Sequence, residues 1–257
     1  MNNIGQKSFG SCITGYPQII SEWILDLIFP VRCISCSRFS VKKSGYFCKK
    51  CLGLISVNSK FECIGCKRRV ILGKTCPSCQ SSNQIDRLLV VSDYENASVV
   101  KIIKTLKYRF IREMAVPISL LIKKYIIWLG SKKKFNILAE NPIIVPVPLH
   151  QRRLNWRGFN QADLIATSLS EVLNCDIQTS TLTREMMTKP QADIQKRETR
   201  LENIKEAFKL ADMEEIKDRT ILLVDDVCTT GATLNECAKV LKEHGALKVI
   251  GLVFARG

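Results

Sequence analysis

The sequence predicts an α/β protein with a mostly parallel sheet flanked by helices, preceded by a small cysteine-rich module. In residues 135–257, apolar strand-like runs alternate with helical patterns, which is typical of a parallel sheet covered on both faces. In residues 33–79, four Cys-x2-Cys pairs follow one another. The chain has 257 residues, 46% of them hydrophobic, so it is long enough to bury a substantial core beside such a module.

The four Cys-x2-Cys pairs are separated by 11, 11 and 9 residues. A two-residue spacer lets both thiolates face one tetrahedral metal ion, so the pairs predict two structural zinc sites. A disulfide framework is disfavoured because we find no secretory signal, and a redox site would need only one pair. Sequential pairing is preferred to cross-bracing because each gap suits a short ribbon. The expected ligands are Cys33, Cys36, Cys48 and Cys51 for one ion, and Cys63, Cys66, Cys76 and Cys79 for the other.

Around this module the first half of the chain is expected to be helical with one strand. Apolar residues at helical spacing predict an amphipathic helix over 18–29; two acids interrupt it, and no membrane span is expected. A strand is expected over 84–94, helices over 96–108 and 113–129, and a loop over 132–134. The module has too few apolar runs for its own core, so metal binding must supply its folding free energy. We place the domains at 18–82 and 83–257.

The second half predicts the strands and helices of the sheet in alternation. The expected strands are 142–147, 179–184, 220–224 and 248–254. The expected helices are 160–173, 195–206 and 233–244, the last ending at Gly245. A basic loop is expected between the strand 142–147 and the helix that begins near residue 160.

The net charge of +15 is concentrated in the first half of the chain. Residues 30–85 carry 11 Lys or Arg against one acid, and residues 98–134 carry 10 against one, whereas residues 135–257 carry 16 against 17 acids. A charge run is usually a solvated face, but this asymmetry favours a polyanion such as single-stranded DNA as a partner. The candidate DNA-binding residues are Lys49, Lys50, Lys67, Arg68, Arg69, Lys101, Lys104 and Lys107. The candidate stacking aromatics are Trp23, Phe39, Tyr46, Phe47, Phe61, Tyr108 and Phe110.

One motif, residues 221–233 (ILLVDDVCTTGAT), carries the strongest chemical signal. A buried strand leads into two carboxylates, a hydroxyl-rich turn with Gly231, and a helix. Backbone N–H groups of such a turn, at a helix N-terminus, favour a phosphate group. The two carboxylates can accept hydrogen bonds from the hydroxyls of a ribose. The carboxyl end of a parallel strand is also where ligands bind in such sheets.

This motif resembles the phosphoribosyl pyrophosphate (PRPP) motif of the type I phosphoribosyltransferases. The resemblance implies that Asp225 and Asp226 hold the ribose hydroxyls and that a loop wraps the 5′-phosphate, with Mg²⁺ bound largely by oxygens of PRPP. The residues of that loop are Cys228, Thr229, Thr230, Gly231, Ala232 and Thr233. Cys228 occupies a variable position of the motif and is given no catalytic role.

Further segments resemble the ComF family. They are 145–150 (VPVPLH), the arginines of 152–157 followed by GFNQ, 189–191 (KPQ), 200–203 (RLEN) and the double zinc ribbon. The family implies a role in DNA uptake during natural transformation, a cytoplasmic location, and PRPP, single-stranded DNA and other DNA-uptake machinery as partners. Arg152, Arg153 and Arg157 are suited to bind pyrophosphate through charge-assisted hydrogen bonds, or else to contact DNA phosphates or solvent. Lys189 and Arg197 are weaker candidates for a closing loop.

Two classes of function remain open. In the first, the protein handles single-stranded DNA and binds PRPP at a site that senses the ligand or is vestigial. In the second, it is an active phosphoribosyltransferase on an unknown acceptor, and DNA binding is incidental. Release of pyrophosphate that depends on an acceptor would separate the two.

Overall fold

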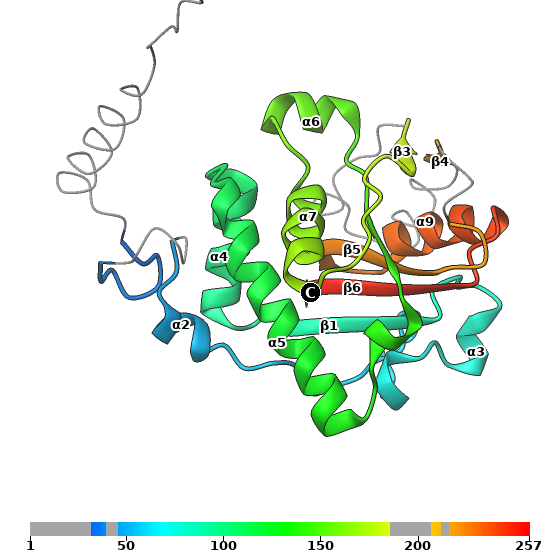
Figure 1. Cartoon of the computed structure of the whole chain (residues 1–257), viewed down its shortest axis with the longest axis horizontal. Helices are drawn as coiled ribbons and strands as arrows, with labels where there is room; N and C mark the ends of the chain where they lie inside the picture. Colours follow the sequence, from blue (N-terminus) through cyan, green and yellow to red (C-terminus); the bar gives the residue numbers. More distant parts are fainter. Residues whose placement is uncertain (1–31, 40–45, 186–206, 212–215) are drawn as a thin grey trace, which may run out of the picture.

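The computed structural model describes residues 32–39, 46–185, 207–211 and 216–257; the expected helices 18–29 and 195–206, and the residues Trp23, Lys189 and Arg197, lie outside these ranges. Its centre is a four-stranded sheet in the order β1-β6-β5-β2, with every neighbouring pair parallel (Figure 1). The strands are β1 (Arg87–Asp93), β2 (Ile143–Pro146), β5 (Thr220–Cys228) and β6 (Lys248–Arg256). The predicted fold class is confirmed.

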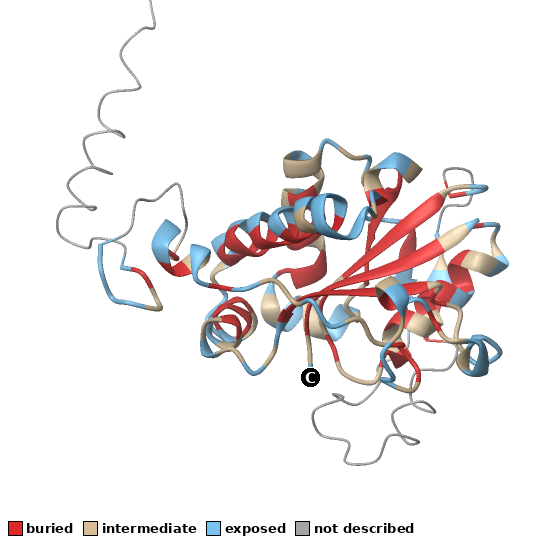
Figure 2. Ribbon diagram, turned by 90° about the horizontal axis from the view of Figure 1, so that it is seen from below, coloured by how far each residue is buried: buried red, intermediate tan, exposed pale blue. Residues whose placement is uncertain are grey.

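Helices cover both faces of this sheet. The first face is covered by α4 (Ala97–Tyr108), α5 (Ala115–Lys133) and α7 (Gln161–Leu173). The second is covered by α9 (Ala232–Glu243) and by an antiparallel pair, β3 (Leu182–Arg184) and β4 (Phe208–Leu210). Side chains alternate along each strand, so Leu222 and Val224 of β5 face the first layer, and Ile221 and Leu223 face the second. The strands are therefore buried on both sides (Figure 2).

The cysteine-rich segment contributes to both layers instead of forming its own core. It contains α2 (Lys49–Gly53), α3 (Pro77–Gln80) and the 3-10 helix η2 (Ile71–Gly73). Phe47 and Ile55, beside the first four cysteines, are buried with α4 and α5. Ile64, between Cys63 and Cys66, is fully buried in the layer of α9. The two cysteine groups therefore pack against opposite faces of the sheet.

Several elements differ from the prediction: β3 begins at Leu182 instead of residue 179, β6 continues to Arg256 instead of ending at residue 254, and β4 was not predicted. Three further differences concern α6, α5 and β5. The basic loop after β2 contains a seven-residue helix, α6 (Gln151–Arg157), that has no buried residue and ends at Gly158 with φ of 73°. Helix α5 continues to Lys133, so two of the three lysines expected in a loop are helical. Strand β5 continues four residues beyond the predicted end at Val224, because β6 pairs with it as far as Cys228.

Two short 3-10 helices, η3 (Arg112–Met114) and η4 (Ile137–Glu140), flank α5. Residues 112–133, which comprise η3 and α5, form a helical stretch that is long and apolar enough to cross a membrane. More than half of its most apolar window (56%) is buried inside the protein. The sequence analysis overlooked this stretch because Lys123 and Lys124 interrupt its apolar run. Burial against the sheet and α7 accounts for its apolar character.

Candidate ligand cavity and metal centres

A cavity of about 350 Å³ opens at the carboxyl end of the sheet. It forms because β2 ends at Pro146, opposite Val224, whereas β5 continues to Cys228. The edge of β5 beyond Val224 is therefore not covered by β2. The polar and charged lining residues are Lys104, Lys107, Arg153, Arg157, Asn160, Gln161, Arg184, Asp225, Asp226, Thr229 and Thr233, together with Tyr94 and Tyr108. The structure thus brings together the predicted acidic pair and most of the predicted arginines.

The two carboxylates lie within β5, where successive side chains point to opposite faces. Asp226 is 5% exposed, and its Oδ2 lies 2.9 Å from Nζ of Lys107. Oδ1 of Asp225 accepts a hydrogen bond of 2.8 Å from the backbone N–H of Asp226. Burial, reinforced by the charge of Asp226, raises the pKa of Asp225 to about 7. The cavity therefore holds one carboxylate that is paired with a lysine and one whose ionisation is opposed by burial and by its neighbour.

Lys107 has a different environment from the one its helical spacing predicts. We expected it on the exposed face of α4 with Lys101 and Lys104, which are exposed. Lys107 instead lines the cavity, and its side chain is only 22% exposed. Burial alone would lower the pKa of Lys107, but the carboxylates of Asp226 and Asp225 outweigh burial and raise the pKa. Lys107 therefore takes part in an ion pair within the cavity, whereas Lys101 and Lys104 are exposed as predicted.

The loop after β5 leads into the N-terminus of α9, where backbone N–H groups have no helical partner. Gly231 takes φ of 85°, which favours glycine, and the hydroxyl of Thr230 accepts a 3.3 Å hydrogen bond from the N–H of Ala232. Thr229 and Thr233 line the cavity, as a phosphate-binding loop requires. Cys228 does not line it; its thiol is buried, and burial raises its pKa to about 11.

Arg153 and Arg157 of α6 line the cavity, whereas Arg152 is exposed and does not. Nη1 of Arg157 donates a 3.0 Å hydrogen bond to Oε1 of Gln161. Nε of Arg157 and Nε2 of Gln161 are buried donors without a hydrogen-bond partner among the described residues. Buried donors without acceptors indicate a cavity that is suited to an anion. Arg184 of β3 also lines this cavity, although no pattern in the sequence predicted it as a site residue.

The eight cysteines form two groups, and within each group all four sulfur atoms lie within 4.8 Å of one another. The groups contain the sequential sets that spacing predicts, which confirms that pairing. The backbone N–H of Cys76 donates to Sγ of Cys63 at 3.4 Å, and Nε of Arg68 donates to Sγ of Cys66 at 3.5 Å. The Arg68 bond lowers the pKa of Cys66 to about 6, which favours the thiolate. Four cysteine sulfurs at this separation fit a tetrahedral metal ion.

The remaining candidate DNA-binding residues divide between the two cysteine groups and α4. Lys49, Lys50 and Lys101 are exposed near the first group, whose Ser35 hydroxyl lies 3.3 Å from that of Ser98 at the start of α4. Near the second group lie Lys67, Arg68 and Arg69, which are exposed. Lys67 Nζ donates to the carbonyl of Gly257 at 3.3 Å. Among the candidate aromatics, Phe47 is buried and Phe61 stacks on Trp128, whereas Phe39, Tyr108 and Phe110 are exposed and Tyr46 is partly buried.

A second cavity, of about 230 Å³, lies where β1 and β6 end. Asp93 and Glu95 line it, while Tyr94 between them lines the first cavity, so the two cavities are neighbours. Its other polar lining residues are Asn58, Lys60, Glu62, Lys67, Ser92 and Arg256. The lining contains cations and acids in equal number. No sequence motif predicted this cavity.

Comparison with known proteins finds a domain family, two relatives and a solved structure to which the chain is similar. Residues 157–257 match the phosphoribosyl transferase domain family. The chain is 33% identical over 217 residues to DNA utilization protein YhgH of Escherichia coli, covering 84% of this chain and 86% of that protein. It is 29% identical over 226 residues to Competence protein F of Haemophilus influenzae, covering 81% and 96%. A solved structure, phosphoribosylpyrophosphate synthetase from Mycobacterium smegmatis, aligns at 16% identity and a TM-score of 0.31, covering 52% and 32%.

The fold and the family match together define a protein with a phosphoribosyl transferase-type domain and two four-cysteine clusters that could each hold a metal ion. The identity shared with YhgH extends through both parts of the chain. The chain belongs to the ComF family.

Proposed function

We propose that this protein binds Mg²⁺-PRPP in the cavity at the end of β5 and single-stranded DNA on its cationic surface, and that it handles DNA in the cytoplasm during natural transformation. The observation that carries the PRPP proposal is the cavity itself. It combines two carboxylates, a hydroxyl-rich loop at a helix N-terminus, and buried donors on the opposite wall. We also propose zinc as the ion in both cysteine centres, because four thiolates are a typical structural zinc site.

In this proposal each wall of the cavity binds one part of PRPP. Asp225 and Asp226 accept hydrogen bonds from the ribose hydroxyls, and the loop 229–233 with the first turn of α9 binds the 5′-phosphate. Arg153 and Arg157 bind the pyrophosphate. Mg²⁺, when bound, neutralises phosphate oxygens of the ligand. Lys107, 2.9 Å from Oδ2 of Asp226, holds that carboxylate in place at the proposed ribose position.

Support for DNA binding comes from charge and from the relatives. The two relatives are named for competence and for DNA utilization. Apart from Lys104 and Lys107, the cations of residues 30–134 do not line the cavity at β5, so a small ligand bound there does not account for them. A cationic surface attracts single-stranded nucleic acid, largely independently of sequence.

The PRPP proposal predicts that exchanging both Asp225 and Asp226 for alanine weakens Mg²⁺-dependent PRPP binding by at least about tenfold. Each hydrogen bond to a charged group is worth about 1.5–3 kcal/mol, and two are lost. Isothermal titration of the zinc-loaded protein with PRPP measures this. Ser131→Ala, far from the cavity on α5, is a control that should bind normally. Equal affinity of the double variant and the wild type would place the PRPP site elsewhere.

The DNA proposal predicts that single-stranded DNA binds with an affinity that falls steeply with salt, by about 0.7 in log affinity per log salt for each phosphate contacted. Changing Lys49, Lys50 and Lys101 to glutamate should weaken binding of oligothymidylate, measured by fluorescence anisotropy, and leave PRPP binding unchanged. These residues are preferred to Lys67 and Arg68, whose side chains already donate hydrogen bonds within the protein. Lys67 donates to the carbonyl of Gly257, and Arg68 donates to Sγ of Cys66.

The control for that variant exchanges three exposed lysines of the nearly neutral half, and it changes the net charge by the same amount. They are Lys209, Lys217 and Lys239. If both triple variants lose DNA affinity equally, the loss is caused by the change in net charge. Lys49, Lys50 and Lys101 would then not form a specific DNA-binding surface. If the wild-type protein shows no salt-sensitive binding, DNA handling is not its function.

A second candidate function, phosphoribosyl transfer, is favoured by the neighbouring cavity at the ends of β1 and β6. An acceptor in that cavity would be separated from bound PRPP by Tyr94. Its mixture of cations and acids suits a polar acceptor. Transfer requires that pyrophosphate be released from PRPP only when an acceptor is added, which a coupled pyrophosphate assay measures. Release without an acceptor would be hydrolysis and would not support this function.

A further inference from the structure

Three exposed aromatic side chains lie at the C-terminal end of α4 and on the neighbouring helix α6. Tyr108, Phe110 and Trp156 are 59%, 42% and 64% exposed. Single exposed apolar residues are common on proteins, but large rings are mostly buried, and adjoining exposed rings mark an interaction surface. We call these three residues the aromatic rim. Figure 1 shows α6 at the outer edge of the molecule, near the upper end of α4.

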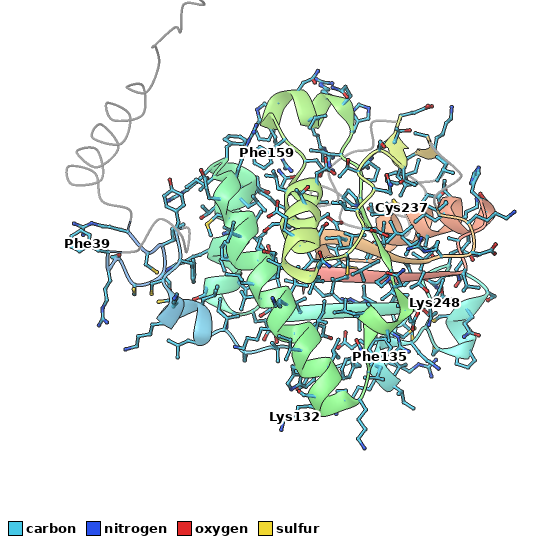
Figure 3. The ribbon with its side chains drawn as sticks, in the orientation of Figure 1. Phe39, Lys132, Phe135, Phe159, Cys237 and Lys248 are labelled. Carbon is cyan, nitrogen blue, oxygen red and sulfur yellow. The ribbon has the colours of Figure 1, made fainter. Side chains whose placement is uncertain are left out.

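The rings of the rim are held in fixed positions before any partner binds. Phe110 has φ of 55°, a left-handed conformation that costs a non-glycine residue about 1–2 kcal/mol. It meets Trp156 edge to face with ring centres 5.6 Å apart, and the buried Phe159 at 6.4 Å. Phe159 is labelled in Figure 3, between α6 and the upper end of α4. Nη2 of Arg112 donates a 2.7 Å hydrogen bond to the carbonyl of Gly158, which ties the α4–α5 connection to the end of α6. Strained, cross-braced residues of this kind are typical of ligand-binding sites.

The rim lies in a strongly cationic environment. Residues 104–113 and 151–157 carry seven Lys or Arg against a single acid, Glu113. The guanidinium of Arg157 lies 5.7 Å from the centre of the Trp156 ring, and that of Arg112 lies 5.2 Å from the Phe159 ring. Arginines interleaved with exposed rings suit a partner with both phosphates and flat apolar faces. An apolar protein surface would meet only the rings and would leave the cations unpaired.

The rim also adjoins the mouth of the first cavity. Tyr108 and Arg157 both line that cavity, and Trp156 immediately precedes Arg157 in α6. Helix α6 has no buried residue, so its tryptophan is not needed for the core. A chain bound on the rim would therefore pass over the opening of the site that we propose for PRPP.

We propose that the aromatic rim binds single-stranded nucleic acid by stacking bases on Trp156, Tyr108 and Phe110, while the neighbouring arginines contact phosphates. This deepens the proposed function and rests on it, because it assigns to DNA a defined path beside the cavity. Base stacking on an aromatic side chain contributes affinity that is independent of sequence. Binding on the rim thus depends on bases, whereas binding on a merely cationic face depends on phosphates alone.

The test compares two ligands and three variants. Trp156→Ala should weaken binding of oligothymidylate by about tenfold, since one stacked base contributes about 1–3 kcal/mol. The same variant should bind an abasic oligonucleotide of equal length as well as the wild type does. Trp156→Phe should restore most of the affinity. Ile127→Ala removes an equally exposed apolar side chain (59%) of α5, and it should change neither affinity.

Thermal melting checks that all the variants fold, which we expect because Trp156 is exposed. A second readout is quenching of tryptophan fluorescence by oligothymidylate, which should be lost in Trp156→Phe. If the wild type binds both oligonucleotides equally and Trp156→Ala has no effect, the rim is not the site, although salt-sensitive DNA binding would stand. If the wild type binds neither oligonucleotide, both this inference and the proposed DNA function fail.

Discussion

Exchange of Cys63 and Cys66 for serine is expected to abolish PRPP binding, whereas exchange of Cys33 and Cys36 is expected to leave it nearly unchanged. The difference follows from Ile64, which lies between Cys63 and Cys66 and is fully buried. A Cβ atom at Gly231 would lie 2.6 Å from Cγ1 of Ile64, so the knuckle of the second metal centre packs directly against the phosphate loop.

Arg256 fixes this knuckle to the end of β6. Its Nη2 donates a 2.9 Å hydrogen bond to the carbonyl of Ile64, and its Nη1 a 3.3 Å bond to that of Cys63. Loss of the metal would release the knuckle and remove the support beneath Gly231. The first centre instead contacts α4 and α5, through Phe47 and Ile55 in the opposite layer. Its loss should lower the melting temperature without moving the phosphate loop.

Zinc analysis and titration with PRPP together measure this outcome. The wild type should contain two zinc ions per chain, and each double-serine variant one. Ile64→Ala serves as a matched variant that keeps all eight cysteines; it should retain both ions but bind PRPP more weakly, because the loop loses its packing partner. Equal loss of PRPP affinity in the two double-serine variants would contradict the proposed contact, and less than one zinc ion in the freshly reduced wild type would contradict the metal assignment.

The sequence predicted the parts of this fold that depend on local pattern. Apolar runs identified the strands of the parallel sheet, and the spacing of the cysteines identified both metal centres. The acidic pair and its loop were found because strand, carboxylates, hydroxyls and glycine follow one another along the chain. Helix α6 was missed because Gln151–Arg157 has no apolar face to produce a helical period.

The residues that complete the cavity could not be predicted because they come from distant segments. Lys107 occupies a position of α4 that helical spacing assigns to solvent, and only the packing of α4 against β5 brings it to Asp226. Arg184 is the last residue of β3, a three-residue strand with no distinctive pattern. Trp156 lies in α6, which the sequence did not predict, so the exposure of its side chain could be recognised only in the structure. Whether a charged or aromatic side chain faces solvent or a cavity depends on tertiary contacts, which periodicity does not contain.

Asp225→Asn and Asp226→Asn are expected to change stability in opposite directions, although both remove one negative charge and both should weaken PRPP binding. Burial and the Asp226 charge raise the pKa of Asp225 to about 7 in the folded protein. The unfolded chain ionises near the ordinary value of about 3.9. The folded state therefore holds its proton more tightly, so ionisation of Asp225 costs stability progressively as pH rises from about 4 to 7, and the cost is complete above pH 7.

Asparagine at position 225 removes this cost and still offers an oxygen to the N–H of Asp226. Asp225→Asn should therefore stabilise the protein at pH 8 by about 1–4 kcal/mol, and by less at pH 6. Asp226→Asn instead deprives the largely buried Lys107 of its 2.9 Å partner, and it should destabilise the protein by about 2 kcal/mol or more. Denaturant unfolding of both variants and the wild type at the two pH values measures the difference. A loss of stability at pH 8 in Asp225→Asn as large as that in Asp226→Asn would show that Asp225 is charged and well paired in the folded protein, contrary to its burial beside a second carboxylate.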